Sequence, residues 1–111
     1  MANEPLATKG NVLHIYDFRV KPGMGDKFVE AFEAFDHSGK NIMHESPAQV
    51  RDGVVCRDTA DPDHFYLIAE WSDEQVHRQL RQKLLEAGSP PEFLQYLEKL
   101  PFAPLYATVV A

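Results

Sequence analysis

The chain has 111 residues, a length typical of one domain, and 44% of them are hydrophobic while 25% are charged. This composition is that of a globular fold and excludes a fibrous or largely disordered chain. The 17 Asp and Glu residues outnumber the 11 Lys and Arg residues, which gives a net charge of −6 at pH 7. Nucleic-acid binding needs a basic surface that displaces counterions, so we expect neither nucleic acid nor an anionic membrane as a partner.

Cysteine usage and the beginning of the sequence predict where the protein resides. Cys56 is the single cysteine, so no intrachain disulfide and no oxidising compartment are required. Residues 1–10 lack the basic and then apolar pattern of a signal peptide, and no apolar run approaches the roughly 20 residues of a membrane helix. We therefore expect a cytoplasmic protein, with a flexible arm over residues 1–10 and one domain over residues 11–111.

Hydrophobic periodicity predicts a strand and then a helix at the start of the domain. Residues 12–20 alternate between two faces, one of which carries His14 and Tyr16, as expected of a half-buried strand. Pro22 and Gly23 end this strand, and phenylalanines at helical spacing predict a helix over residues 25–37. We interpret those phenylalanines as part of the hydrophobic core.

The rest of the chain alternates in the same way between strand and helix patterns. Ser72, with Gln75 three residues later, predicts the start of a second helix whose buried side is apolar. The Asp52-Gly53 pair inside the second strand predicts a bulge. The remaining predicted elements are strands over residues 48–58, 65–71 and 105–110, the second helix with Val76, Leu80 and Leu84 as its buried stripe, and a short third helix over residues 91–100.

The order of these elements predicts an α+β fold of the ferredoxin-like βαββαβ type, an antiparallel sheet with both main helices on one face. The other face of the sheet would still carry Leu13, Ile15, Tyr66 and Ile68. An exposed apolar patch of that size usually marks an interface. We therefore predict a homodimer that forms through the open face of the sheet.

Three stretches together resemble one family. They are Phe18–Gly23 with its Val-Lys-Pro-Gly turn, Arg57–Phe65, and Glu70–Glu74, in which a Glu-Trp-Ser sequence joins a strand end to a helix start. The chain resembles the antibiotic biosynthesis monooxygenase domain family over roughly residues 11–85. This resemblance implies a dimeric α+β barrel. Characterised members include oxygenases of anthrones and quinols that need no cofactor, and haem-degrading enzymes.

The resemblance also implies a pocket between the sheet and the helices, lined by Trp71. Period-two alternation puts Leu67 on the same face as Trp71, with His14 and Tyr16 beside them on the first strand. His77 and Arg81 lie four residues apart and therefore on one side of the second helix. We accordingly predict His77, His14 and Tyr16 as catalytic residues, and Trp71, Arg81, Leu67 and Phe32 as substrate-binding residues.

These residue types suit oxygenation of a small phenolic or polycyclic aromatic molecule by dioxygen without a metal or flavin. Such a substrate donates its own electron to dioxygen, while the protein supplies a base and hydrogen-bond donors for the developing charge. A neutral histidine is the natural base near pH 7. No histidine has a strong metal-ligand spacing with Cys56 or a carboxylate, so we expect neither a metal nor a cofactor.

Departures from the family pattern leave alternatives open. Tyr16 and Arg81 stand where the haem-degrading branch has an Asn and a His, so haem binding would require His77 or His14 as a substitute ligand. Leu67 and His77 stand where the anthrone-oxidising branch has an Asn and a Tyr. The alternatives are a non-catalytic dimeric protein that binds a small molecule, a haem-binding relative, or a cyclase or isomerase on the same scaffold.

Overall fold

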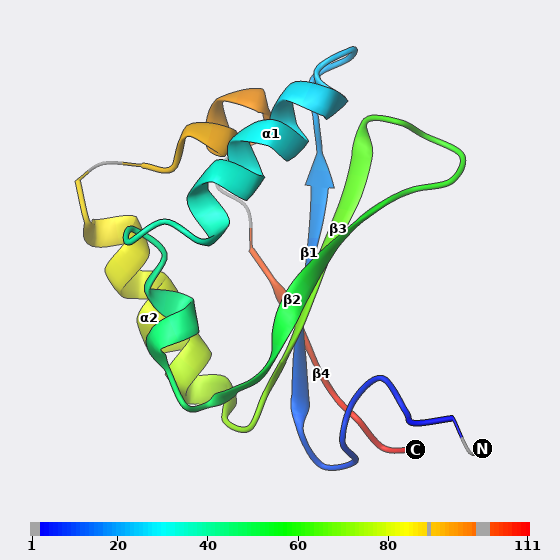
Figure 1. The fold of residues 1–111 in the computed structure, drawn as a ribbon, viewed down its shortest axis with the longest axis vertical. Coiled ribbons are helices and arrows are strands. Elements are labelled where there is room, and N and C mark those ends of the chain that lie inside the picture. Colours follow the sequence, from blue (N-terminus) through cyan, green and yellow to red (C-terminus); the bar gives the residue numbers. More distant parts are fainter. Residues whose placement is uncertain (1–2, 89, 100–102) are drawn as a thin grey trace.

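The protein is an antiparallel sheet covered on one face by two helices (Figure 1). The computed structural model describes residues 3–88, 90–99 and 103–111. The sheet has the strand order β2-β3-β1-β4, which confirms the predicted ferredoxin-like topology. Its strands are β1 (Val12–Arg19), β2 (Gln49–Arg57), β3 (His64–Trp71) and β4 (Leu105–Thr108), and its helices are α1 (Gly25–Asp36) and α2 (Glu74–Glu86).

Strand β1 lies in the middle of the sheet and supplies the side chains on which the helices pack. It pairs antiparallel with β3 and β4, so that His14 lies between Ala69 and Tyr106. Its alternation is the predicted one, because His14, Tyr16 and Phe18 are buried while the residues between them are half-buried or exposed. The two-residue period of the strand therefore sets which side chains face the helices.

A bulge in β2 brings Gly53 close to the side chains of β3, beside the pocket described below. The pairing of β2 with β3 shifts register on both sides of Arg51, which confirms the predicted irregularity at Asp52-Gly53. A Cβ atom on Gly53 would lie 3.2 Å from Leu67 Cδ1 and 3.3 Å from Ala69 Cβ. A side chain at this position would require Leu67 and Ala69 to move by a few tenths of an ångström.

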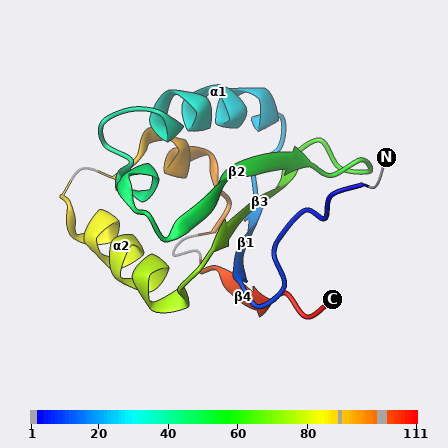
Figure 2. The same cartoon turned by 60° about the horizontal axis from the view of Figure 1, so that its bottom comes forward.

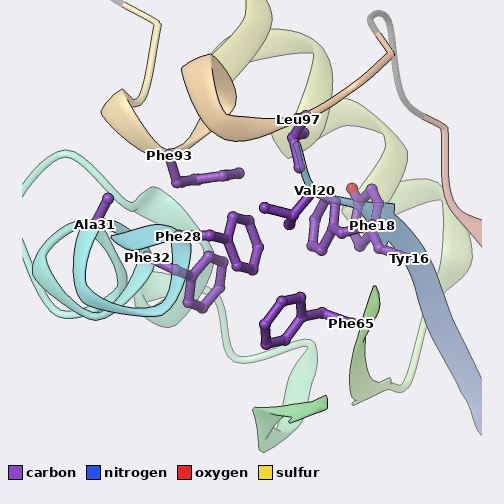
Figure 3. Close-up of a cluster of buried hydrophobic side chains, with 9 residues drawn as sticks. All are labelled: Tyr16, Phe18, Val20, Phe28, Ala31, Phe32, Phe65, Phe93 and Leu97. Carbon is purple, nitrogen blue, oxygen red and sulfur yellow. The ribbon is translucent and has the colours of Figure 1, made fainter. Parts of the chain in front are cut away.

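Aromatic side chains from β1, β3, α1 and the segment after α2 form the core (Figure 3). Phe28 is fully buried and lies 4.9 Å from Phe65 and 5.4 Å from Phe18 between ring centroids. The phenylalanines of α1 thus serve the core, as their spacing predicts. The cluster comprises Tyr16, Phe18, Val20, Phe28, Ala31, Phe32, Phe65, Phe93 and Leu97.

Three sequence predictions need correction around α2. The helix is capped by Asp73 rather than Ser72, because the Asp73 side chain accepts a hydrogen bond of 2.8 Å from Gln75 N. The predicted apolar stripe of α2 is only half-buried, and His77 is the helix's buried residue. The predicted third helix is a short 3₁₀ helix, η2 (Glu92–Tyr96), while residue 100 lies outside the described part of the chain.

The segment before β1 runs on the side of the sheet away from the helices (Figure 2). Glu70 is 2% exposed on that side, and its carboxylate accepts hydrogen bonds of 2.8 Å from Thr8 N and from Asn11 Nδ2. Arg51 bonds both to this carboxylate and to Leu6 O. Residues 6–8 of the predicted arm therefore contact the sheet.

Among the described residues, no helix combines the length and the apolarity that crossing a membrane requires.

Candidate functional site

A pocket opens between the sheet and the elements that cover it, namely α1, α2, η2 and a second 3₁₀ helix, η1 (Ile42–Glu45). Its cavity volume is about 90 Å³. Apolar side chains form most of the wall, including Leu67 of β3 and Phe32 of α1. One end is closed by the buried residues His14, Tyr16 and His77, whereas Asp36, His44 and Asp52 form a more exposed rim.

His14 is held in one tautomer by the indole of Trp71. Trp71 Nε1 donates a hydrogen bond of 3.0 Å to His14 Nδ1, and an indole nitrogen is a donor only. Burial, together with the neighbouring His77, lowers the pKa of His14 to about 3, so the ring is neutral at pH 7. His14 Nδ1 is therefore an acceptor, and the hydrogen sits on Nε2, a buried atom with no hydrogen-bond partner.

His77 is the second histidine at the closed end, and β4 holds it in place. Its Nδ1 lies 2.6 Å from the hydroxyl oxygen of Tyr106, while its Nε2 is buried without a hydrogen-bond partner. The rings of His77 and His14 are 4.4 Å apart between centroids. Burial, assisted by the charges of Arg81 and Arg78, lowers the pKa of His77 to about 4. His77 is thus also a neutral imidazole at pH 7.

Tyr16 and Arg81 complete the closed end of the pocket. Burial raises the pKa of Tyr16 to about 12, although the charge of Arg81 and a hydrogen bond from it act in the opposite direction. The phenol therefore keeps its proton at neutral pH. Arg81 brings a permanent positive charge to the closed end, where the neighbouring histidines and Tyr16 are neutral.

The closed end is consequently suited to negative charge on a ligand oxygen. His14 Nε2–H is a fixed donor, Tyr16 is a protonated phenol, and Arg81 is a cation. Charge–charge and hydrogen-bond energies are larger in such a buried site than in water. An aromatic ligand could place its ring against the apolar wall and its oxygen at these donors, which is the usual design of a small-molecule pocket.

Of the seven predicted site residues, six line the cavity and one does not. Trp71 is 1% exposed and lies behind His14, which it orients, so the prediction that it lines the pocket is wrong. The six that line the cavity are His14, Tyr16, Phe32, Leu67, His77 and Arg81.

Tyr106 is the residue of this site that sequence reasoning missed. It stands opposite His14 in the β1–β4 pairing, and its ring lies under the Arg78 guanidinium at 4.3 Å. The alternation of the last strand could have put Tyr106 on the helix-covered face, but its partner His77 lies 29 residues away on another element.

The two neutral histidines should make the stability of the protein depend on pH. In the unfolded chain both have a pKa near 6.5, so between pH 6.5 and about 4 the unfolded state binds more protons. The free energy of unfolding should therefore fall as the pH falls, by about 1.4 kcal/mol per pH unit for each histidine. Burial lowers the pKa of His44, but the hydrogen bond to Asp36 and the charges of Asp36 and Asp52 outweigh burial and raise it. His44 therefore makes the free energy of unfolding depend on pH only above pH 6.5, outside this window.

Urea unfolding at pH 5.0, 5.5, 6.0 and 6.5 measures this dependence, and stopping at pH 5 keeps the carboxylates ionised. His77→Gln should roughly halve the slope. If the free energy of unfolding of the parent protein does not change between pH 5.0 and 6.5, the two histidines are protonated in the folded state.

The fold and the pocket define an α+β protein of the ferredoxin-like class with a pocket under its helices. The family model for antibiotic biosynthesis monooxygenases matches residues 12–99. The chain therefore belongs to the antibiotic biosynthesis monooxygenase family. A search of curated proteins finds no match.

Solved structures share this fold at low sequence identity. A protein from Bordetella bronchiseptica assigned to the same family is 16% identical, with a TM-score of 0.67 over 93% of this chain and 100% of that one. SnoaB, a cofactor-independent oxygenase from Streptomyces nogalater, is 16% identical, with a TM-score of 0.57 over 92% and 93%. A dimeric ferredoxin-like protein from an uncultured marine organism is 10% identical, with a TM-score of 0.67 over 93% and 90%.

Proposed function

We propose that the protein is a cofactor-independent monooxygenase that acts on a small phenolic or quinol-like aromatic molecule. The observation that carries this proposal is the closed end of the pocket, where two neutral histidines, a protonated phenol and a guanidinium lie beside a mostly apolar wall. Membership of the family and the likeness to SnoaB give it further support. The compact cavity favours burial of one phenolic ring, with the rest of a larger substrate extending toward the rim.

His77 is the base in this proposal. His14 cannot accept a proton at Nε2, because Trp71 fixes the hydrogen on that atom. His77 Nε2 is a free base in the tautomer that carries its hydrogen on Nδ1, in which the ring donates to the Tyr106 hydroxyl oxygen across the 2.6 Å contact. The low pKa of His77 belongs to the empty pocket, and a phenolate formed beside it would raise that pKa.

The proposed reaction begins when His77 removes a proton and leaves an electron-rich phenolate or enolate. Arg81, Tyr16 and His14 Nε2–H stabilise the charge on its oxygen. The anion passes one electron to dioxygen, and the resulting radical and superoxide combine to a peroxide. Loss of water from the peroxide turns an activated CH₂ group into C=O, so that CH₂ and O₂ give C=O and H₂O. The substrate supplies all the electrons.

We also propose that two copies pair through the open face of the sheet. The predicted apolar side chains of that face are half-buried in the single chain, and a structural relative is described as dimeric. Pairing would remove this apolar surface from water.

Oxygen uptake tests the proposed reaction. The protein is mixed with an anthrone or a quinol in the presence of a chelator, and dioxygen consumption is followed together with hydrogen peroxide. We expect consumption above the buffer rate, one dioxygen per anthrone, and no accumulated peroxide. If no substrate of the panel is consumed faster than in buffer while it still binds, the protein is a binding module. Peroxide formed in equal amount would indicate simple autoxidation.

A further inference from the structure

The rim of the pocket carries a second group of chemically active side chains. Asp36 ends α1, His37 follows it, and η1 returns the chain so that His44 faces both. His44 Nε2 lies 3.0 Å from Asp36 Oδ1, and His37 Nε2 lies 3.4 Å from Asp36 Oδ2. Asp52 approaches from β2, with Oδ2 at 3.9 Å from His37 Nε2. One ligand atom from each of Asp36, His37 and His44 lies within 4.8 Å of the others.

These spacings match those of ligands around a small divalent cation. Zinc–nitrogen and zinc–oxygen bonds of about 2.0–2.2 Å at tetrahedral angles hold neighbouring ligand atoms about 3.3–3.6 Å apart. The two measured contacts of Asp36 fall within a few tenths of an ångström of this range. The rings of His37 and His44 lie nearly parallel, with centroids 5.0 Å apart, so one ring has to turn before both Nε2 lone pairs point at one ion. The His37 side chain is 71% exposed and is free of packing that would prevent this turn.

Further side chains orient the ligand atoms. His44 Nδ1 lies 3.0 Å from Gln49 Oε1 and 3.3 Å from Asp52 Oδ1. A hydrogen on Nδ1 satisfies these acceptors and leaves the Nε2 lone pair aimed at Asp36. Asn41 Nδ2 donates to Asp36 Oδ1 at 3.2 Å. Metal-binding histidines almost always donate their other ring N–H to an acceptor in this manner.

The charges of the cluster also favour a cation. Asp36 and Asp52 contribute two negative charges, and both histidines can be neutral ligands. Opposite charges attract more strongly where the site is partly shielded from water, so this pair of carboxylates favours a divalent cation.

From this arrangement we propose that His37 Nε2, His44 Nε2 and the Asp36 carboxylate bind a first-row divalent cation such as Zn²⁺, with Asp52 as a nearby support. Two imidazoles and one carboxylate suit a borderline cation of this kind. Because Asp36 and His44 line the cavity, the remaining coordination positions lie at the pocket rim, within reach of an oxygen atom on a bound ligand. The site is separate from the closed end and does not depend on the proposed oxygenase activity.

Spectroscopic titration of the tag-free full chain with Co²⁺ tests this site without any substrate. At pH 7.5 we expect one equivalent of Co²⁺ to give visible d–d absorption, and Zn²⁺ to displace it. His37→Gln and His44→Gln should each weaken Co²⁺ binding at least about 100-fold, because each removes a ligand. Gln49→Leu should weaken it about 10-fold through the orientation of His44. The His37 side chain is 71% exposed, so His37→Gln keeps the fold testable.

Two variants outside the cluster serve as controls. Glu33→Gln removes an exposed carboxylate one turn earlier on α1, and His77→Gln removes one of the two histidines of the closed end; neither should change Co²⁺ affinity. The proposal fails if millimolar Co²⁺ gives no d–d absorption, or if His37→Gln and His44→Gln bind Co²⁺ as the parent does. Loss of binding in His77→Gln would also overturn it, because the ion would then sit at the closed end.

Discussion

Replacing His77 with glutamine is expected to lower kcat for oxygen uptake by about 10²–10⁴-fold, the usual contribution of a general base. The amide of glutamine fills a similar space and can still bond to the Tyr106 hydroxyl, but it cannot accept a proton. Because Arg81, Tyr16 and His14 remain, KM should change far less than kcat. The measurement is steady-state oxygen consumption over a range of substrate concentrations.

His64→Gln is the matched control for this variant. His64 is also buried, but it bonds to Asp17 on the face of the sheet away from the pocket, at 2.7 Å. Its replacement should leave kcat unchanged. Thermal unfolding of both variants shows whether they are folded, so that loss of the base can be distinguished from loss of the fold. Equal oxygen uptake by folded His77→Gln and the parent would remove His77 from the reaction.

The main elements could be predicted because they depend on local patterns. The alternation in β1 fixes His14 and Tyr16 on the helix-covered face, and the phenylalanine spacing fixes the buried side of α1. A period of two or of 3.6 residues can be found in the sequence without knowledge of the partners. Period-two alternation and a spacing of four residues likewise predict Leu67 and Arg81 at the pocket, and both line the cavity.

The details that decide the chemistry depend on contacts between distant residues. Alternation in β3 predicts Trp71 at the pocket surface, yet the side chain is buried and bonds from β3 to His14 on β1. Tyr106 and His77 meet only because β4 pairs with β1 beneath α2. The cluster of His37 and His44 forms because η1 reverses the chain after α1, a turn that residue spacing alone does not predict.

A phenol bound in the pocket is expected to ionise at lower pH than the same phenol in water. A guanidinium near the ligand oxygen and hydrogen bonds from Tyr16 and His14 Nε2–H favour the phenolate. Effects of this kind lower a pKa by about 1–3 units, whereas burial of the ligand opposes them. We expect the favourable effects to dominate, because the closed end supplies a full positive charge and two donors.

Arg81→Gln should abolish most of this pKa shift, because it removes the positive charge while keeping a polar side chain of intermediate length. Lys83→Gln is the control, since Lys83 is an exposed cation on the same helix. Lys83→Gln should lower the pKa of the bound phenol as much as the parent protein does.

Absorption spectroscopy of bound 4-nitrophenol tests most directly whether the closed end stabilises an oxyanion. The spectrum is recorded with saturating protein at a pH where the free ligand is mostly protonated. We expect the phenolate band for the parent and for Lys83→Gln, and the neutral phenol band for Arg81→Gln. A neutral spectrum for ligand that is bound in the parent protein would contradict it.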